Sequence, residues 1–218
     1  MIISEVKSKR DTALVKYSKE YDNYDVQSAN ELEISKEECL EALKKISEEE
    51  LEALKFARSR IQEFSEHQKT KPWNYTSKGI TLGEKITAID KVGLYVPGGS
   101  AAYPSSVLMN SIPAKVAGVK EITMVFPSPK GKVNNMVLAA AYLGGVDRIF
   151  RIGGAHAVAA LAFGTDTIPK VNMIVGPGSQ YVAEAKKELY GEVGIDNFAG
   201  PSEIVVIADS SANEEWIA

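Results

Sequence analysis

The chain has 218 residues, of which 44% are hydrophobic and 25% are charged, a composition typical of globular proteins. Its net charge of −4 argues against a nucleic-acid partner and against an anionic membrane surface. No stretch approaches the roughly twenty apolar residues that cross a bilayer, and charges from Glu5 onward are not typical of a signal peptide. The single cysteine, Cys39, excludes an internal disulfide and fits a reducing compartment, so we expect a cytoplasmic protein.

The first 70 or so residues have the pattern of helices. A first amphipathic helix ending near Tyr21 is predicted by the apolar side chains Ile2, Ile3, Val6, Leu14, Val15 and Tyr17. Ser35 with Glu38, and Ser47 with Glu50, form capping-box patterns in which a hydroxyl and a carboxylate bind the free amides of a helix start. Apolar residues at helical spacing follow each pair, so two further helices are expected.

Two isolated side chains of this region could in principle do chemistry. Cys39 falls inside a charged helical pattern, and His67 falls near the end of the last helical pattern. Neither has a second His or Cys beside it in the sequence, and both are therefore interpreted as ordinary helix residues.

The second part of the chain alternates strands with helices. Residues 71–79 (KPWNYTSKG) are a turn-rich break, and residues 80–89 and 91–96 then read as extended. Strand-like runs follow at 92–96, 121–126, 148–152, 171–175 and 203–208, with helical patterns at about 104–118, 132–144, 155–163 and 179–190. This alternation predicts right-handed crossovers and a mostly parallel sheet. Pro113 is expected to break the 104–118 pattern into two helical pieces.

Glycine turns follow three of these strands. In open α/β sheets, ligands bind beyond the carboxyl ends of the strands, where glycine allows close approach and helix N-termini offer free amides. A dinucleotide or phosphate site is therefore a candidate at YVPGG, RIGGAH and VGPGSQY, while a tight turn alone explains each one equally well. None fits the G-x-G-x-x-G fingerprint, since Tyr181 occupies the third glycine position after Gly176 and Gly178.

Together, four segments resemble histidinol dehydrogenase in order and spacing. They are VGLYVPGGSAAYPSSVLMNSIPAKVAGV, GGAHAVAALAFGT, VGPGSQYVAEAKKELYG and AGPSEIVVIAD. The resemblance runs along the whole chain and implies a zinc-containing homodimer that oxidises L-histidinol through L-histidinaldehyde to L-histidine, using two NAD in succession. It also implies an aldehyde-dehydrogenase-like fold. We thus expect an N-terminal helical region over 1–78 and a Rossmann-like, mostly parallel α/β domain over 79–218, incomplete relative to the family.

The resemblance also implies site residues. Tyr95 matches a tyrosine that contacts NAD, and Ser202 matches a serine at the substrate site. His156 stands where the family usually has a glutamine, and Ser179 where it usually has an asparagine, both at cofactor positions. Neither substitute offers the paired donor and acceptor of an amide, so we expect weaker contact with NAD.

The zinc ligands and the Glu–His acid–base pair of the family lie beyond Ala218 by this resemblance. Zinc needs about four ligands, or three and an open position, and two isolated histidines do not supply them. We therefore expect neither metal-ligating nor catalytic residues in this chain, and no histidinol oxidation by it alone. It would be a shortened version, a split-gene product completed by a C-terminal half, or a degenerate homologue.

Two other classes of function stay open. A stand-alone nucleotide-binding module would keep the fold without the chemistry, as the departures at His156 and Ser179 suggest. A purely structural or interaction protein is disfavoured by the intact glycine turns. In each case we expect self-association through apolar surface that the α/β domain leaves uncovered.

Overall fold

The computed structural model describes residues 1–98, 102–197 and 203–217. Across these residues, six strands form one sheet in the order β1-β6-β5-β4-β7-β8. The strands are β1 (Glu33–Ile34), β4 (Lys91–Tyr95), β5 (Glu121–Val125), β6 (Arg148–Phe150), β7 (Met173–Val175) and β8 (Gly194–Ile195). β1 pairs antiparallel with β6, and all other neighbours are parallel. The predicted α/β class with a mostly parallel sheet is confirmed.

Helices cover both faces of this sheet, because alternate residues of the central strands are buried on opposite sides. Tyr95 and Val125 belong to one core, and Leu94 and Met124 belong to the other. The first core is covered by α1 (Ile2–Lys9), α2 (Asp11–Asp22), α7 (Gly154–Phe163) and α8 (Gln180–Glu188). The second is covered by α3 (Lys36–Lys45), α4 (Glu48–His67), α5 (Pro104–Ala117) and α6 (Asn135–Leu143). No helix in the described part of the chain is both long and apolar enough to span a membrane.

The N-terminal helices follow their local signals with one exception. Both capping boxes form, with Glu38 N–H donating to Ser35 Oγ over 3.2 Å and Glu50 N–H donating to Ser47 Oγ over 3.2 Å. The single helix expected up to Tyr21 is instead two helices, since Arg10 adopts a φ of 48° and separates α1 from α2. The break lets both helices pack on α7, where they bury their apolar sides.

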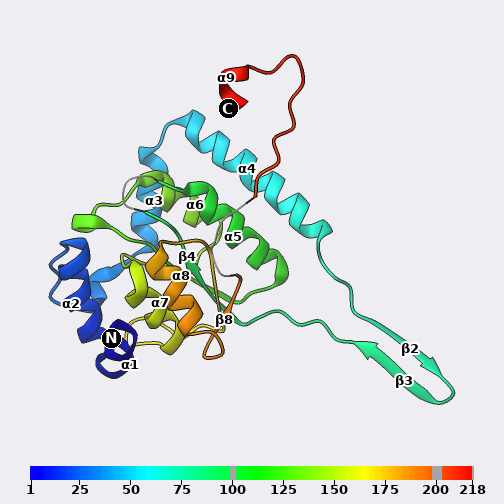
Figure 1. The fold of residues 1–218 in the computed structure, drawn as a ribbon, viewed down its shortest axis with the longest axis horizontal. Helices are drawn as coiled ribbons and strands as arrows, with labels where there is room; N and C mark the ends of the chain where they lie inside the picture. Colours follow the sequence, from blue (N-terminus) through cyan, green and yellow to red (C-terminus); the bar gives the residue numbers. More distant parts are fainter. Residues whose placement is uncertain (99–101, 198–202, 218) are drawn as a thin grey trace.

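A β-hairpin replaces the expected turn-rich break. β2 (Trp73–Ser77) pairs antiparallel with β3 (Ile80–Glu84) through Lys78 and Gly79, which adopt φ values of 50° and 80°. Two positive φ values in a two-residue loop match the twist of a hairpin. Figure 1 shows the hairpin projecting from the body, and every residue of both strands is exposed. The domain boundary between residues 78 and 79 falls in this turn and stays a prediction.

Two further expectations were wrong. α5 continues through Pro113 without a break, because the burial of Val107, Leu108 and Ile112 on one side of the helix offsets the roughly 3 kcal/mol that a helical proline costs. Residues 203–208 form no strand, although the other four predicted strands are present. A strand needs a neighbour to accept its hydrogen bonds, and no described strand pairs with this segment.

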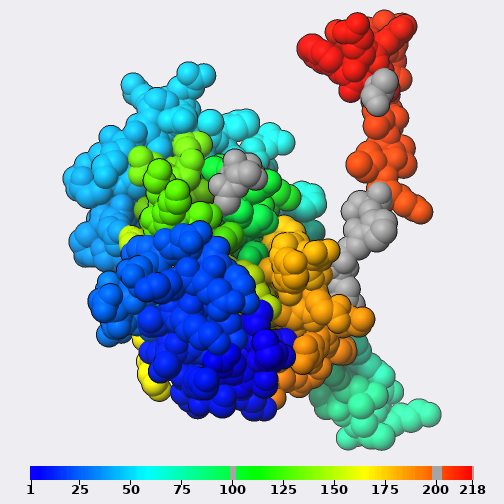
Figure 2. Space-filling model, turned by 60° about the vertical axis from the view of Figure 1, so that its left-hand side comes forward, coloured from blue at the N-terminus to red at the C-terminus, as the bar shows by residue number. Residues whose placement is uncertain are grey.

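The remaining elements are short. They are the 3-10 turns η1 (Ala29–Leu32) and η2 (Pro129–Gly131) and the helix α9 (Glu214–Ile217). Residues 203–217, in orange and red, extend away from the body in Figure 2. The same view shows the N-terminal helices in blue beside the orange surface of α8 and its neighbours, so the beginning of the chain forms part of the α/β body.

Candidate functional site

The carboxyl ends of the parallel strands share one edge of the sheet. The chain order reverses at β4, which lies between β5 and β7. Such a switch point opens a crevice in which α/β proteins bind ligands. Tyr95 ends β4 and Gly176 directly follows β7, so the two lie on either side of this crevice. They also touch, because a Cβ on Gly176 would lie 2.1 Å from the Tyr95 carbonyl oxygen.

Tyr95 links the switch point to α7. Its side chain is buried, and its hydroxyl oxygen accepts a hydrogen bond from the Gly154 N–H over 2.9 Å. Burial raises the pKa of Tyr95 above its usual value of 10.0, so the phenol stays protonated at neutral pH. Tyr95 is therefore fixed at the start of the helix that carries His156.

His156 is enclosed rather than open to solvent. Only 2% of its surface is exposed, and its ring centroid lies 5.5 Å from that of Tyr17 and 6.0 Å from that of Tyr21. Its Nε2 is buried and has no hydrogen-bond partner within residues 1–98, 102–197 and 203–217. Burial lowers the pKa of His156 to about 4, so the imidazole is neutral at pH 7. A neutral ring of this kind is poorly suited to donate a proton.

Asp22 is a buried acid at the same place that the sequence did not single out. It ends α2, is 7% exposed, and its Oδ2 has no hydrogen-bond partner among the residues that the structure describes. Burial raises the pKa of Asp22 from 3.8 to about 6. Its charge in turn contributes to the raised pKa of Tyr95. Buried polar groups without partners are rare in proteins, and two of them beside Tyr95 mark this end of α2 and α7 as a candidate ligand site.

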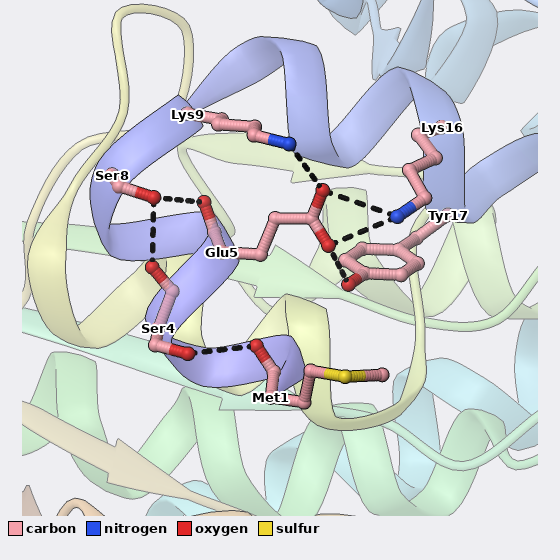
Figure 3. A network of polar contacts seen from close by, with 7 residues as sticks. All are labelled: Met1, Ser4, Glu5, Ser8, Lys9, Lys16 and Tyr17. Carbon is pink, nitrogen blue, oxygen red and sulfur yellow. Dashed lines mark hydrogen bonds and ion pairs between the residues drawn. The ribbon is translucent and has the colours of Figure 1, made fainter.

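The N-terminal helices that wall this site are held by a polar network around Glu5 (Figure 3). The Glu5 carboxylate accepts hydrogen bonds from the ammonium groups of Lys9 and Lys16 and from the Tyr17 hydroxyl. The hydrogen bond from Tyr17 is the largest cause that lowers the pKa of Glu5 to about 2, and it raises the pKa of Tyr17 to about 12. Because the Tyr17 ring also lies against His156, the network fixes the cover of the candidate site.

Ser179 lies on a separate, exposed part of the edge. It is the N-cap residue of α8, and its side chain makes no capping hydrogen bond. The turn before it is tightly packed, since a Cβ on Gly178 would lie 2.5 Å from Val182. The structure thus brings Tyr95 next to the turn of Ser179 and next to the helix of His156. Ser202, the expected substrate residue, lies outside the described residues.

The other face of the sheet carries a cavity at the same edge. It has a volume of about 420 Å³ and lies beyond the carboxyl ends of β4 and β5. Its lining includes Gly98, Phe126, Pro127, Lys130, Lys132 and Asn134. The two lysines and the start of α6 give this cavity a positive character.

Metal-binding groups do not gather anywhere in the part of the chain that the structure describes. No three His, Cys, Asp or Glu side chains lie close enough there to hold an ion. His67 is the last residue of α4, and Cys39 is buried inside α3, as expected for ordinary helix residues. Burial raises the pKa of the Cys39 thiol to about 11, which makes it a poor nucleophile.

Strand order, switch point and glycine turns define an α/β protein with a Rossmann-like, mostly parallel sheet. Comparison with known proteins is more specific. The family model of histidinol dehydrogenase matches residues 1–218, and the chain belongs to this oxidoreductase family of histidine biosynthesis.

Relatives match along the whole chain. It is 54% identical over 218 residues to the histidinol dehydrogenase of Dechloromonas aromatica and 53% identical to that of Aromatoleum aromaticum, covering 100% of this chain and 50% of each relative. The crystal structure of histidinol dehydrogenase from Elizabethkingia anophelis superposes with a TM-score of 0.91 at 38% identity, over 99% of this chain and 50% of that one. The chain therefore spans about half the length of the relatives it matches.

Proposed function

We propose that this chain forms the cofactor-binding half of a histidinol dehydrogenase. The whole enzyme would oxidise L-histidinol through L-histidinaldehyde to L-histidine, with two NAD in succession. The observation that carries the proposal is the meeting of Tyr95 and Gly176 at the switch point of a parallel sheet, in a chain that the family matches from end to end. Switch points of this kind bind dinucleotides in many unrelated enzymes.

NAD fits the edge around Tyr95 and Ser179. The Tyr95 hydroxyl accepts from Gly154, and its own O–H can donate to a ligand once the cover over this buried side chain opens. The Ser179 hydroxyl is exposed and unused as a cap, so it can also donate. Glycine at 176 and 178 lets the backbone approach a bound molecule closely. Bound NAD would supply the hydride acceptor, while these residues bind and orient it.

His156 fits NAD less well than the glutamine usual in the family. The imidazole offers one acceptor and one donor on opposite sides of a ring, and Tyr17 and Tyr21 cover it. Contact with a cofactor requires Tyr21, which is 52% exposed, to turn away. His156→Gln should therefore strengthen NAD binding, measured by calorimetry. Unchanged affinity would show that His156 only packs the end of α7.

Zinc does not fit the residues that the structure describes, because no ligand cluster is present among them. Removal of the proton from an alcohol needs a base in contact with the substrate, and His156, enclosed by Tyr17 and Tyr21, is not placed to act as one. The 218 residues alone should not oxidise histidinol, and a C-terminal half should restore the reaction. Ser202 is proposed to contact the substrate. The proposed compartment of the protein is the reducing cytoplasm.

A second candidate is a nucleotide-binding module without catalysis. The enclosure of His156 favours it, because a buried imidazole stands where the resemblance to the family implies a glutamine that contacts NAD. Calorimetric titration of the chain with NAD, AMP and nucleoside diphosphates separates the two functions. Binding of NAD that Tyr95→Phe weakens supports the dehydrogenase half, whereas tighter binding of another nucleotide supports the module.

A further inference from the structure

An ion pair between a buried lysine and a partly exposed aspartate lies behind the turn that follows β7. Lys186 of α8 is 3% exposed, and its ammonium group binds the carboxylate of Asp196, the residue after β8. Lysine is almost never this buried without a partner. A buried ion pair is weak evidence for stability, because desolvation of the two charges offsets much of their attraction. The other groups that the pair binds therefore indicate its role better than its contribution to stability does.

Lys186 and Asp196 also bind the two peptide groups that flank Gly176, one group each. The Lys186 ammonium donates to the Gly176 carbonyl oxygen over 3.1 Å, and the Gly176 N–H donates to Asp196 Oδ2 over 2.8 Å. The Asn197 N–H donates to Asp196 Oδ1 over 2.7 Å, which fixes the carboxylate itself. The donor and the acceptor of a single glycine are thus both held by charged groups, and such hydrogen bonds are stronger than neutral ones.

Gly176 is held from the opposite side by the end of β4. With a φ of 103° it adopts a conformation that favours glycine, and a Cβ there would lie 2.1 Å from the Tyr95 carbonyl oxygen. The turn then runs through Gly178 to Ser179, the N-cap residue of α8. Since α8 also carries Lys186, the turn, the helix and the ion pair form one closed unit at the switch point.

We propose that Lys186 and Asp196 are positioning residues for the cofactor turn. They hold Gly176 so that the backbone of residues 176–178 and the Ser179 hydroxyl face bound NAD beside Tyr95. This inference rests on the proposed function. It differs from a purely structural role because it requires the pair to set the geometry of the turn as well as the stability of the chain.

The test compares single variants with a double variant. Asp196→Asn leaves the buried Lys186 ammonium without its charged partner, and Lys186→Met leaves the partly exposed Asp196 carboxylate without its own. Both should lower the melting temperature, Asp196→Asn more strongly. The double variant Lys186→Met/Asp196→Asn leaves no unpaired charge and should regain most of the lost stability. Lys170→Met is the matched control, because it removes a lysine from an exposed 2.8 Å ion pair with Glu192.

NAD affinity separates the two roles. Calorimetry is carried out at a temperature where every variant is folded. We expect the double variant to bind NAD about tenfold more weakly than the wild type although it is restored in stability, as for other supporting residues behind a binding site. The control variant should bind like the wild type. Wild-type affinity in the double variant would overturn the inference and leave the proposed function intact.

Amide hydrogen exchange distinguishes a positioning role of the pair from a general effect on stability. In Lys186→Met the Gly176 and Gly178 amides should exchange faster, while the turn at Gly153 and Gly154 stays unchanged. Equal changes at both turns would mean general loosening and would overturn the positioning role. Failure of the wild-type chain to bind NAD would instead refute the proposed function, and with it any role of the pair toward a cofactor.

Discussion

Asp22 gives the sharpest prediction about stability. Its folded-state pKa is about 6, against 3.8 for the free side chain, because burial disfavours the carboxylate. The protonated acid therefore contributes stability that is fully present below the unfolded-state pKa and is lost as the pH rises through 6. At about 1.36 kcal/mol per pKa unit, roughly 3 kcal/mol is lost in total, of which on the order of 1 kcal/mol falls between about pH 5 and pH 8.

Urea denaturation of the wild type, Asp22→Asn and Asp25→Asn at about pH 5 and pH 8 measures this effect. Between the two pH values, the free energy of unfolding of Asp22→Asn should fall by about 1 kcal/mol less than that of the wild type. Relative to the wild type, the variant should therefore be most stable at the higher pH. Asp25→Asn is the control, since it removes the same charge from an exposed pair with Lys19. The reasoning is refuted if Asp22→Asn keeps the wild-type slope with pH, or if Asp25→Asn changes it equally.

Three further predictions concern the edge of the sheet and the hairpin. Tyr95→Phe should lower the free energy of unfolding, measured by urea denaturation, by about 1–3 kcal/mol, because the Gly154 N–H loses its acceptor. An unchanged free energy would show that water replaces the hydroxyl. Gly176→Ala should destabilise the chain by at least about 2 kcal/mol more than Gly191→Ala. Both glycines have positive φ, but of the two only Gly176 has backbone atoms within 4 Å of the added methyl group. Similar melting temperatures of the two variants would contradict this. Leu82→Ser on the exposed hairpin should weaken self-association in analytical ultracentrifugation, and a wild-type chain that stays monomeric at high concentration would contradict it.

The sequence predicted those parts of the fold whose signals are local. A capping box needs only residues three apart, so the starts of α3 and α4 at Ser35 and Ser47 could be foreseen. Buried parallel strands such as β4 and β5 are apolar on both faces, which the sequence displays directly. Residues 203–208 carry the same apolar pattern but form no strand. A strand forms only beside a second strand that accepts its hydrogen bonds, and a local sequence pattern does not show whether such a strand is present. Pro113 is tolerated for a similarly non-local reason, the packing of α5.

The candidate site was predictable only in part. Tyr95 could be chosen from its place at the end of a strand and from family resemblance. Asp22 gave no signal, because its burial arises from the packing of α2 on elements far along the chain, such as α7 and η2. Lys186 and Asp196 likewise read as ordinary surface charges until α8 and β8 bring them together behind Gly176. His156 was expected to contact a cofactor, and its enclosure by Tyr17 and Tyr21 became evident only from the fold.

Complementation tests the central proposal most directly. The chain is mixed with zinc, NAD, L-histidinol and the separately produced C-terminal half of a related histidinol dehydrogenase, and NADH formation is followed. We predict NADH only when both halves and zinc are present, and less of it when the chain carries Tyr95→Phe. Steady NADH formation by the chain alone, or none from two halves that bind each other, would contradict the account.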